Sequence, residues 1–395
     1  MIYELVSLFE RFILYSVMYT VSLYLINQAN RAKNRATFIA FSFFALLLPC
    51  LFAAYRGETV GTDVLQYAKP YYLGALNSGT LQSYLLQGSA ETGYEVFVFF
   101  VTKLFGNFNA VLFFTEALII VPVYCVAIKN RKSCPMWVTM FVYYMVFYIA
   151  SFNFMRQSVA AAFLLLAYFE LIEKKWISFV LLVCVAQLFH NTAFIGVAVI
   201  IFGVCFYRLK SKQLRFLAFT ALCIILILIS INWETLITWA IYDLKILPRR
   251  FVNYVNIFTG GQNQSSYYFL LTKSNYIELI FRWLLYIGPI ICCSKKITDT
   301  SLYKSANIIL LLSVVVYTAL FVLFHTSYAV RITWYMEYFF LVWLPICYSR
   351  IEIKKEHVGI ISRSSGVMFL LAFSYWFCGY MILGWHGTLP FVFSF

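Results

Sequence analysis

Residues 109–134 read NAVLFFTEALIIVPVYCVAIKNRKSC, and this stretch decides the fold. Residues 109–128 are almost all apolar, and about 20 such residues are enough for a helix to cross a bilayer. Three basic residues, Lys129, Arg131 and Lys132, follow at once. Short basic connections are typical of the cytoplasmic side of a membrane. An apolar run followed by a basic connection recurs along the chain, which predicts an all-α polytopic membrane protein.

The composition of the whole chain points the same way. The 395 residues are 63% hydrophobic and only 12% charged, with a mean hydropathy of +0.82, whereas a soluble domain carries about 25% charged residues. These values exclude a soluble globule, a disordered chain and a nucleic-acid-binding domain. The excess of 30 Lys and Arg over 16 Asp and Glu is therefore assigned to cytoplasmic loops.

The apolar runs predict about twelve transmembrane helices in a single membrane domain, residues 1–395. They lie near 2–26, 37–55, 109–128, 135–151, 154–172, 175–190, 191–207, 214–232, 276–293, 305–324, 329–348 and 366–385. The run 93–105 is short and contains Glu95 and Lys103, so it is interpreted as an interfacial or re-entrant helix. Counting it as a span would break the alternation of the basic connections.

Those basic connections give the orientation of the chain. With twelve spans, six of them fall on one side: 27–36, 129–134, 173–175, 207–216, 294–304 and 349–363. That side is predicted to be cytoplasmic. Both termini and two larger segments, about 56–108 and 233–275, then lie on the outer face, where the working surface is expected.

Arginines near the outer helix ends are candidate ligands for an anionic lipid. Arg156, Arg282 and Arg331 lie close to these ends, and Arg56 lies in the first outer segment. A charge within a span costs about 2.5–3.5 kcal/mol, and snorkelling to lipid head groups is the alternative to a binding role. Guanidinium groups bind phosphate oxygens with paired donors, and Tyr335 follows Arg331 on the same helical face. These residues predict binding of a diphosphate-bearing lipid.

Candidate proton acceptors lie on the same face. His190 stands at the aqueous edge of its span, where an imidazole accepts a proton near neutral pH; a hydrogen-bonded structural histidine is the alternative. Asp63 and Glu95 lie beside apolar and aromatic residues, so burial could tune their pKa. Glu91 equally reads as a solvated loop charge, and His325 is a second outer-face histidine.

Several chemistries lack their residues. The sequence contains no G-x-x-x-x-G-K-[ST] loop for nucleotide hydrolysis and no G-x-S-x-G elbow. It contains neither H-E-x-x-H nor a cluster of Cys and His that would hold zinc. No metal and no other cofactor is expected.

Three groups of motifs resemble the EpsG/Wzy-type polysaccharide polymerases of bacterial inner membranes, over about 37–395. They are Tyr55-Arg56-Gly57 with Gly61-Thr62-Asp63, Tyr67 and Gly93-Tyr94-Glu95; Asn153-Phe154-Met155-Arg156-Gln157 with Phe189-His190-Asn191-Thr192-Ala193; and Arg331-Ile332-Thr333-Trp334-Tyr335 with Leu389-Pro390-Phe391. Two departures are mild. Asn191 follows His190 where a small Ser often follows, and Pro390-Phe391 stands where Pro-Tyr is usual.

The resemblance implies glycosyl transfer at the periplasmic face of the inner membrane, with a multi-span fold similar to the GT-C class. A chain on undecaprenyl pyrophosphate would be the donor, and a repeat unit on the same carrier the acceptor, with no nucleotide sugar and no metal. In this chemistry Arg156 and Arg331, supported by Arg56 or Arg282, would stabilise the leaving pyrophosphate. His190, Asp63 or Glu95 would deprotonate the acceptor hydroxyl. The segment 233–275 is interpreted as a saccharide-binding or gating lid.

Other interpretations stay open at this stage. An O-antigen ligase-like transferase shares outer-face arginines and a histidine, but requires lipid A core as acceptor. A lipid-linked oligosaccharide flippase or carrier would spread charges through a central cavity, with symmetry between its halves. The sequence leaves open the repeat-unit sugars, the product class (O-antigen, capsule or exopolysaccharide), the oligomeric state and dependence on a protein partner that regulates chain length.

Overall fold

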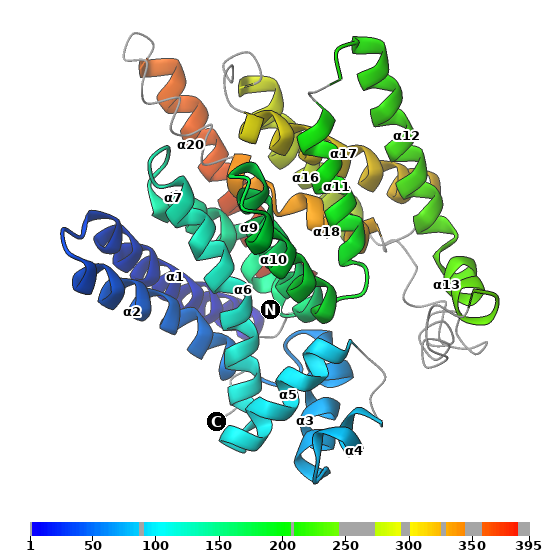
Figure 1. The fold of residues 1–395 in the computed structure, drawn as a ribbon. Helices are drawn as coiled ribbons and strands as arrows, with labels where there is room; N and C mark the ends of the chain where they lie inside the picture. Colours follow the sequence, from blue (N-terminus) through cyan, green and yellow to red (C-terminus); the bar gives the residue numbers. More distant parts are fainter. Residues whose placement is uncertain are drawn as a thin grey trace.

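The computed structural model describes residues 2–86, 91–206, 209–244, 273–293, 301–324, 329–343 and 358–385. The elements in these ranges are helices (Figure 1). The first half contains α1 (Ile2–Arg31), α2 (Arg35–Ala54), α3 (Lys69–Asn77), α4 (Leu81–Leu85), α5 (Thr92–Phe105), α6 (Phe108–Asn130), α7 (Met136–Val142), α8 (Ile149–Ser151), α9 (Met155–Ile172) and α10 (Trp176–Phe189). The second half contains α11 (Ala193–Phe206), α12 (Lys212–Ile231), α13 (Trp233–Tyr242), α16 (Lys273–Cys293), α17 (Ser301–Phe324), α18 (Ala329–Glu337) and α20 (Val358–Ser374). π-Helical turns occupy Val64–Ala68, Tyr143–Tyr148 and Tyr375–Ile382.

The expected fold class is confirmed, because each of the twelve expected spans contains a helix. Within the described residues, six helices are long and apolar enough to cross a membrane: α1, α2, α6, α9, α12 and α17. The same ranges contain four shorter apolar helical stretches, at Met136–Ser151, α10, α11 and Gly366–Ile382. The helices α16 and α18 belong to neither group, and both carry buried charges. The count of twelve spans stays a prediction.

Local sequence sets several of the helix ends. The side chain of Asn34 accepts a hydrogen bond from Thr37 N at 2.7 Å and caps α2, and Asn107 caps α6 in the same way. Between α5 and α6 the chain turns at Gly106, whose φ of +64° is a left-handed conformation that glycine adopts without strain.

The described residues of the segment 56–108 form a compact helical group at one end of the bundle. Here α3 and α4 pack against α5, beyond the start of α6 (Figure 1). The run 93–105, expected as an interfacial or re-entrant helix, is the 14-residue α5. Of the segment expected as a lid, the structure describes α13 and residues up to 244, while 245–272 lie outside the described residues.

Candidate functional site

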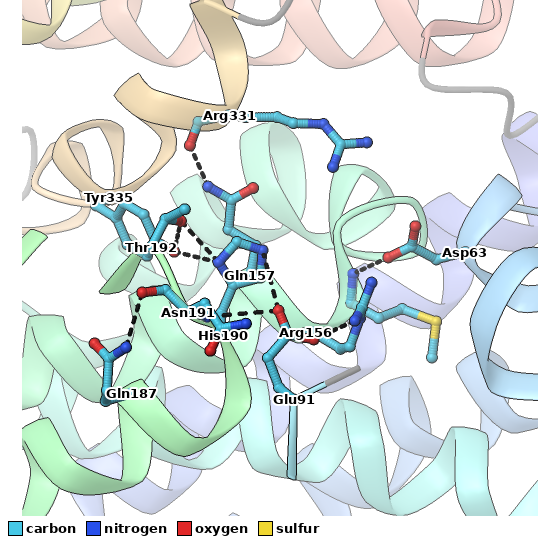
Figure 2. Close-up of polar contacts among 11 residues, drawn as sticks. Asp63, Glu91, Arg156, Gln157, Gln187, His190, Asn191, Thr192, Arg331 and Tyr335 are labelled. Atoms are coloured by element: carbon cyan, nitrogen blue, oxygen red, sulfur yellow. Dashed lines mark hydrogen bonds and ion pairs between the residues drawn. The ribbon is translucent and has the colours of Figure 1, made fainter. Parts of the chain in front are cut away.

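The start of α9, the end of α10, α18 and the residue before α5 meet at this end of the bundle (Figure 2). Gly93 in the first turn of α5 explains the close approach of α5 and α10. A Cβ added to Gly93 would lie 2.6 Å from both the Cβ and the carbonyl oxygen of Leu188. Only glycine permits this approach, which brings Glu91 beside His190 and Asn191.

A buried ion pair joins Arg156 to Glu91. The Nη1 of Arg156 donates to Oε2 of Glu91, and both side chains are only 4% exposed. The guanidinium also stacks on Tyr67, with its Cζ 3.8 Å from the ring centroid. Burial acts to raise the pKa of Glu91, but Arg156, His190 and backbone hydrogen bonds, among them that from Asn191, together outweigh it and hold that pKa below its usual value. Glu91 therefore stays ionised and keeps Arg156 oriented.

His190 follows α10 and contacts three polar side chains. Its Nδ1 is hydrogen-bonded to the hydroxyl of Tyr335 at 2.7 Å and to that of Thr192 at 2.8 Å. On the other side of the ring, Nε2 lies 4.0 Å from Oε1 of Glu91. Burial lowers the pKa of His190 to about 4, with Arg156 adding to the effect and Glu91 opposing it. The imidazole is therefore neutral at physiological pH, and its low pKa makes it a weak proton acceptor unless an anionic neighbour stabilises its charged form.

Asp63 lies where the segment before α3 contacts the start of α9. Its Oδ2 accepts a hydrogen bond from the backbone N–H of Met155 at 3.0 Å. Two neighbours fix the turn around it: Thr62 N donates to Asn153 Oδ1 at 3.0 Å, and Gly61 has a φ of +89°. Burial raises the pKa of Asp63 against the opposing charge of Arg156. Asp63 is thus held close to the cluster and is harder to ionise than a solvated aspartate.

Arg331 reaches over the cluster from α18. Its backbone carbonyl accepts a hydrogen bond from the side-chain amide of Gln157, and its Cζ lies 6.0 Å from the ring centroid of Phe154. Figure 2 shows its side chain extending toward the Asp63 side of the cluster. Its positive charge acts to lower the pKa of both Asp63 and His190. Arg331 is partly exposed, so it offers a guanidinium to a ligand that approaches Arg156.

Arg56 supports the loop that leads into α9. It is 2% exposed, its Cζ lies 4.2 Å from the ring centroid of Phe152, and its Nη2 lies 3.5 Å from Sδ of Met155. Its Nη1 donates to the Ala53 carbonyl at 2.8 Å. These contacts place Arg56 behind the residues that flank Arg156.

Two other expected site residues lie away from the cluster. Glu95 is fully buried in α5. The pKa of Tyr84 in α4 is raised mainly by the burial of Tyr84 and next by the charge of Glu95. Arg282 in α16 belongs to a second buried ionic cluster, where it donates to Glu278 at 2.7 and 3.0 Å and to Glu337 of α18. The catalytic and binding roles expected for the eight residues stay predictions. His325 and 389–391 lie outside the described residues.

The structure adds residues to the cluster that were not among the expected site residues. Glu91 was equally interpreted as a solvated loop charge, yet it is among the most buried carboxylates at this end. Its place two residues before Gly93 is the one signal in the sequence that could have identified it. Thr192 and Gln157 join through hydrogen bonds to His190 and Arg331. Among the described residues, no group of three or more His, Cys, Asp or Glu is placed to hold a metal ion.

Helices that span a membrane, with an arginine–carboxylate–histidine cluster at one end of the bundle, define the class: a polytopic membrane protein with a buried polar site near one face. The sequence profile of the EpsG family matches residues 38–393. The chain therefore belongs to the EpsG family, a polymerase-type family of surface-polysaccharide biosynthesis, and the resemblance drawn from the motifs is confirmed. No curated protein and no solved structure shows significant similarity to the chain.

Proposed function

We propose that the chain is a glycosyltransferase that polymerises undecaprenyl-pyrophosphate-linked oligosaccharide repeat units into a surface polysaccharide. The observation that carries the proposal is the cluster of Arg156, Glu91 and His190, in which one carboxylate pairs with a buried guanidinium and lies 4.0 Å from a neutral imidazole. The guanidinium of Arg156 would bind the lipid pyrophosphate, and the imidazole of His190 would activate a sugar hydroxyl.

The chemistry follows from the charges that develop during transfer. As the bond between the donor sugar and its pyrophosphate breaks, negative charge grows on the leaving oxygen. Fixed positive donors lower the energy of that state, and Arg156 with Arg331 would supply them. A neutral imidazole accepts the proton of the acceptor hydroxyl as its oxygen attacks the anomeric carbon. We favour His190 over Asp63 for this role because its imidazole lies beside Glu91, the carboxylate that pairs with Arg156.

The distribution of basic residues supports a site on the periplasmic face of the inner membrane. Arg156 stands at the start of α9, and Lys174 and Lys175 follow its other end. The 18 residues of α9 separate these ends by about 27 Å. Lys129, at the far end of α6, lies 2.8 Å from both Glu170 and Glu173. The end opposite the cluster therefore carries basic connections of the kind that face the cytoplasm.

The test is polymerisation by the purified protein in detergent, supplied with its repeat unit on undecaprenyl pyrophosphate and without nucleotide or metal. Products are separated as a glycan ladder on a gel. We expect a ladder from the wild type that is lost in Arg156→Ala and His190→Ala and kept in Arg131→Ala, a matched change at an exposed arginine. Transfer only to added lipid A core would instead identify a ligase-like transferase. Transport of the lipid across vesicles with neither product would identify a carrier.

A further inference from the structure

The carboxylate of Glu91 has different neighbours at its two oxygens. Oε2 of Glu91 accepts from Arg156, whereas Oε1 lies 3.5 Å from the backbone nitrogen of Asn191 and 4.0 Å from Nε2 of His190. The distance to His190 exceeds a hydrogen bond, which needs about 2.7–3.2 Å. In the structure, Glu91 thus pairs with Arg156 and stands short of His190 by about 1 Å.

The contacts of His190 assign different tasks to its two ring nitrogens. Hydroxyl groups of Tyr335 and Thr192 contact Nδ1, and the carboxylate of Glu91 faces Nε2. A neutral imidazole carries one proton, and a facing carboxylate favours it on Nε2. This leaves Nδ1 as the acceptor nitrogen, on the side where hydroxyl groups gather.

An anionic ligand that binds Arg156 must compete with Glu91. The carboxylate already occupies Nη1 of the guanidinium, and both side chains are buried. Two negative groups in a buried site repel each other, and a buried carboxylate without a partner is costly. Besides the backbone N–H of Asn191, which already lies 3.5 Å from Oε1 of Glu91, the imidazole of His190 at 4.0 Å is the side chain within the described cluster that can receive the displaced carboxylate.

We propose that Glu91 exchanges partners when the lipid pyrophosphate binds, leaving Arg156 and hydrogen-bonding to Nε2 of His190; this proposal rests on the proposed function. Glu91 then holds the imidazole and stabilises its charged form. The acceptor hydroxyl displaces the hydroxyl of Thr192 or Tyr335 from Nδ1 and gives its proton to that nitrogen, and its oxygen forms a bond to the anomeric carbon. The bond from that carbon to the donor pyrophosphate breaks, and its electron pair leaves with the lipid pyrophosphate. Glu91 is a positioning residue for both Arg156 and His190.

The first test compares binding with turnover in Glu91→Gln. Binding of undecaprenyl pyrophosphate to the purified protein is measured in detergent, and turnover is measured from the glycan ladder. Because glutamine does not compete as an anion for Arg156, we expect several-fold tighter binding. Because His190 loses its anionic partner, we expect kcat to fall about a hundredfold. The matched control is Glu58→Gln, which removes a half-exposed carboxylate paired with Lys69 at 2.5 Å and should change neither quantity.

Two results of this test would overturn the exchange. Weaker binding together with slower turnover would mean that Glu91 only holds Arg156 in place. Unchanged binding and turnover would mean that Glu91 has no part in either step. The binding arm needs no catalysis, so a wild type that binds the lipid without making polymer would fail the proposed function while the exchange is still tested.

The second test uses pH, since the partner of His190 differs before and after binding. The groups that face His190 are Glu91 before α5, Arg156 of α9, Thr192 before α11, and Arg331 and Tyr335 of α18. The profile of kcat/KM reports the free enzyme and that of kcat the substrate complex. A carboxylate moved onto Nε2 raises the pKa of the imidazole, so the acid limb of kcat should lie at higher pH than that of kcat/KM. In Glu91→Gln this separation should vanish, and coincident limbs in the wild type would contradict the exchange.

Discussion

Arg156 combines three contacts that a lysine would not reproduce together. Its planar guanidinium stacks on Tyr67, pairs with Glu91 and carries several N–H groups in one rigid plane. Paired donors in a rigid plane match two phosphate oxygens at once, whereas an ammonium is a point charge. The side chain is therefore specialised by its shape as well as by its charge.

For this reason we expect Arg156→Lys to fold normally and to bind lipid pyrophosphate about tenfold more weakly or worse. Binding of undecaprenyl pyrophosphate to the purified variant measures the loss, and thermal unfolding checks the fold. The exposed Arg131→Lys serves as the matched control and should bind as the wild type does. Equal affinity in Arg156→Lys would show that charge alone is recognised.

At the scale of single residues, the sequence predicted part of the cluster. His190, Arg156, Asp63 and Tyr335 were each chosen separately, and the structure brings them together. Glu91 was not chosen, because its burial depends on the contact between Gly93 and Leu188, and these residues are far apart in the sequence. A sequence pattern distinguishes a solvated carboxylate from a buried one only when the residues that bury the carboxylate are close to it in the sequence.

Among the helices, the contact of α5 with α10 positions the carboxylate side of the site. Gly93→Ala would place a Cβ 2.6 Å from the backbone of α10, so one of the two helices must shift. We expect a loss of about 1–3 kcal/mol in stability and a fall in polymerisation larger than the loss of folded protein explains, since Glu91 moves away from His190. Gly79→Ala is the control, because an added Cβ there meets no atom within 4 Å. Wild-type activity in Gly93→Ala would show that the contact of α5 with α10 is not needed to position Glu91 for polymerisation.

The second ionic cluster holds α18 from its other side. Glu337 accepts hydrogen bonds from Arg282, from Tyr286 at 3.2 Å and from Thr333 at 2.6 Å, and Arg282 stacks on Tyr317 at 4.6 Å. Glu278 and Arg282 are four residues apart, so their pairing was visible in the sequence. The pairing of Arg282 with Glu337 joins two separate helices, so it could not be predicted from sequence spacing.

These contacts separate a structural from a substrate-binding role for Arg282. Arg282→Leu leaves two buried carboxylates without their cation, which we expect to cost about 3–5 kcal/mol of stability. Replacing Glu278 and Glu337 by Gln in the same chain should recover much of that loss, as measured by thermal unfolding. If the recovered triple variant also polymerises, Arg282 acts through α18; a folded but inactive triple variant would assign it to the substrate.

For the molecule as a whole, apolar runs of about 20 residues predicted where the helices lie. Apolar runs predict helix positions because each helix must be apolar by itself to lie in lipid. The arrangement of the helices around α18 depends instead on contacts between segments that are far apart in the sequence. The same apolar runs and basic connections predict which end of the bundle faces outward.

That orientation is testable with cysteines introduced at opposite ends. Gly79→Cys lies among the helices around α5, and Arg131→Cys lies beyond α6. We expect a membrane-impermeant maleimide added to intact spheroplasts to label Gly79→Cys above the level of the native chain, and Arg131→Cys only after lysis. The reverse pattern would put the cluster on the cytoplasmic face and exclude a periplasmic reaction.

The nine residues of α18 carry a consequence for how this chain evolves. Tyr335 contacts His190 from one side of the helix, while Thr333 and Glu337 are tied to the Arg282 cluster. A substitution that alters the contacts on either side of α18 displaces the whole of this short helix. Substitutions at positions 278, 282 and 337 are therefore expected to accompany one another among homologues, and a lineage that loses the arginine should lose both carboxylates and keep its histidine.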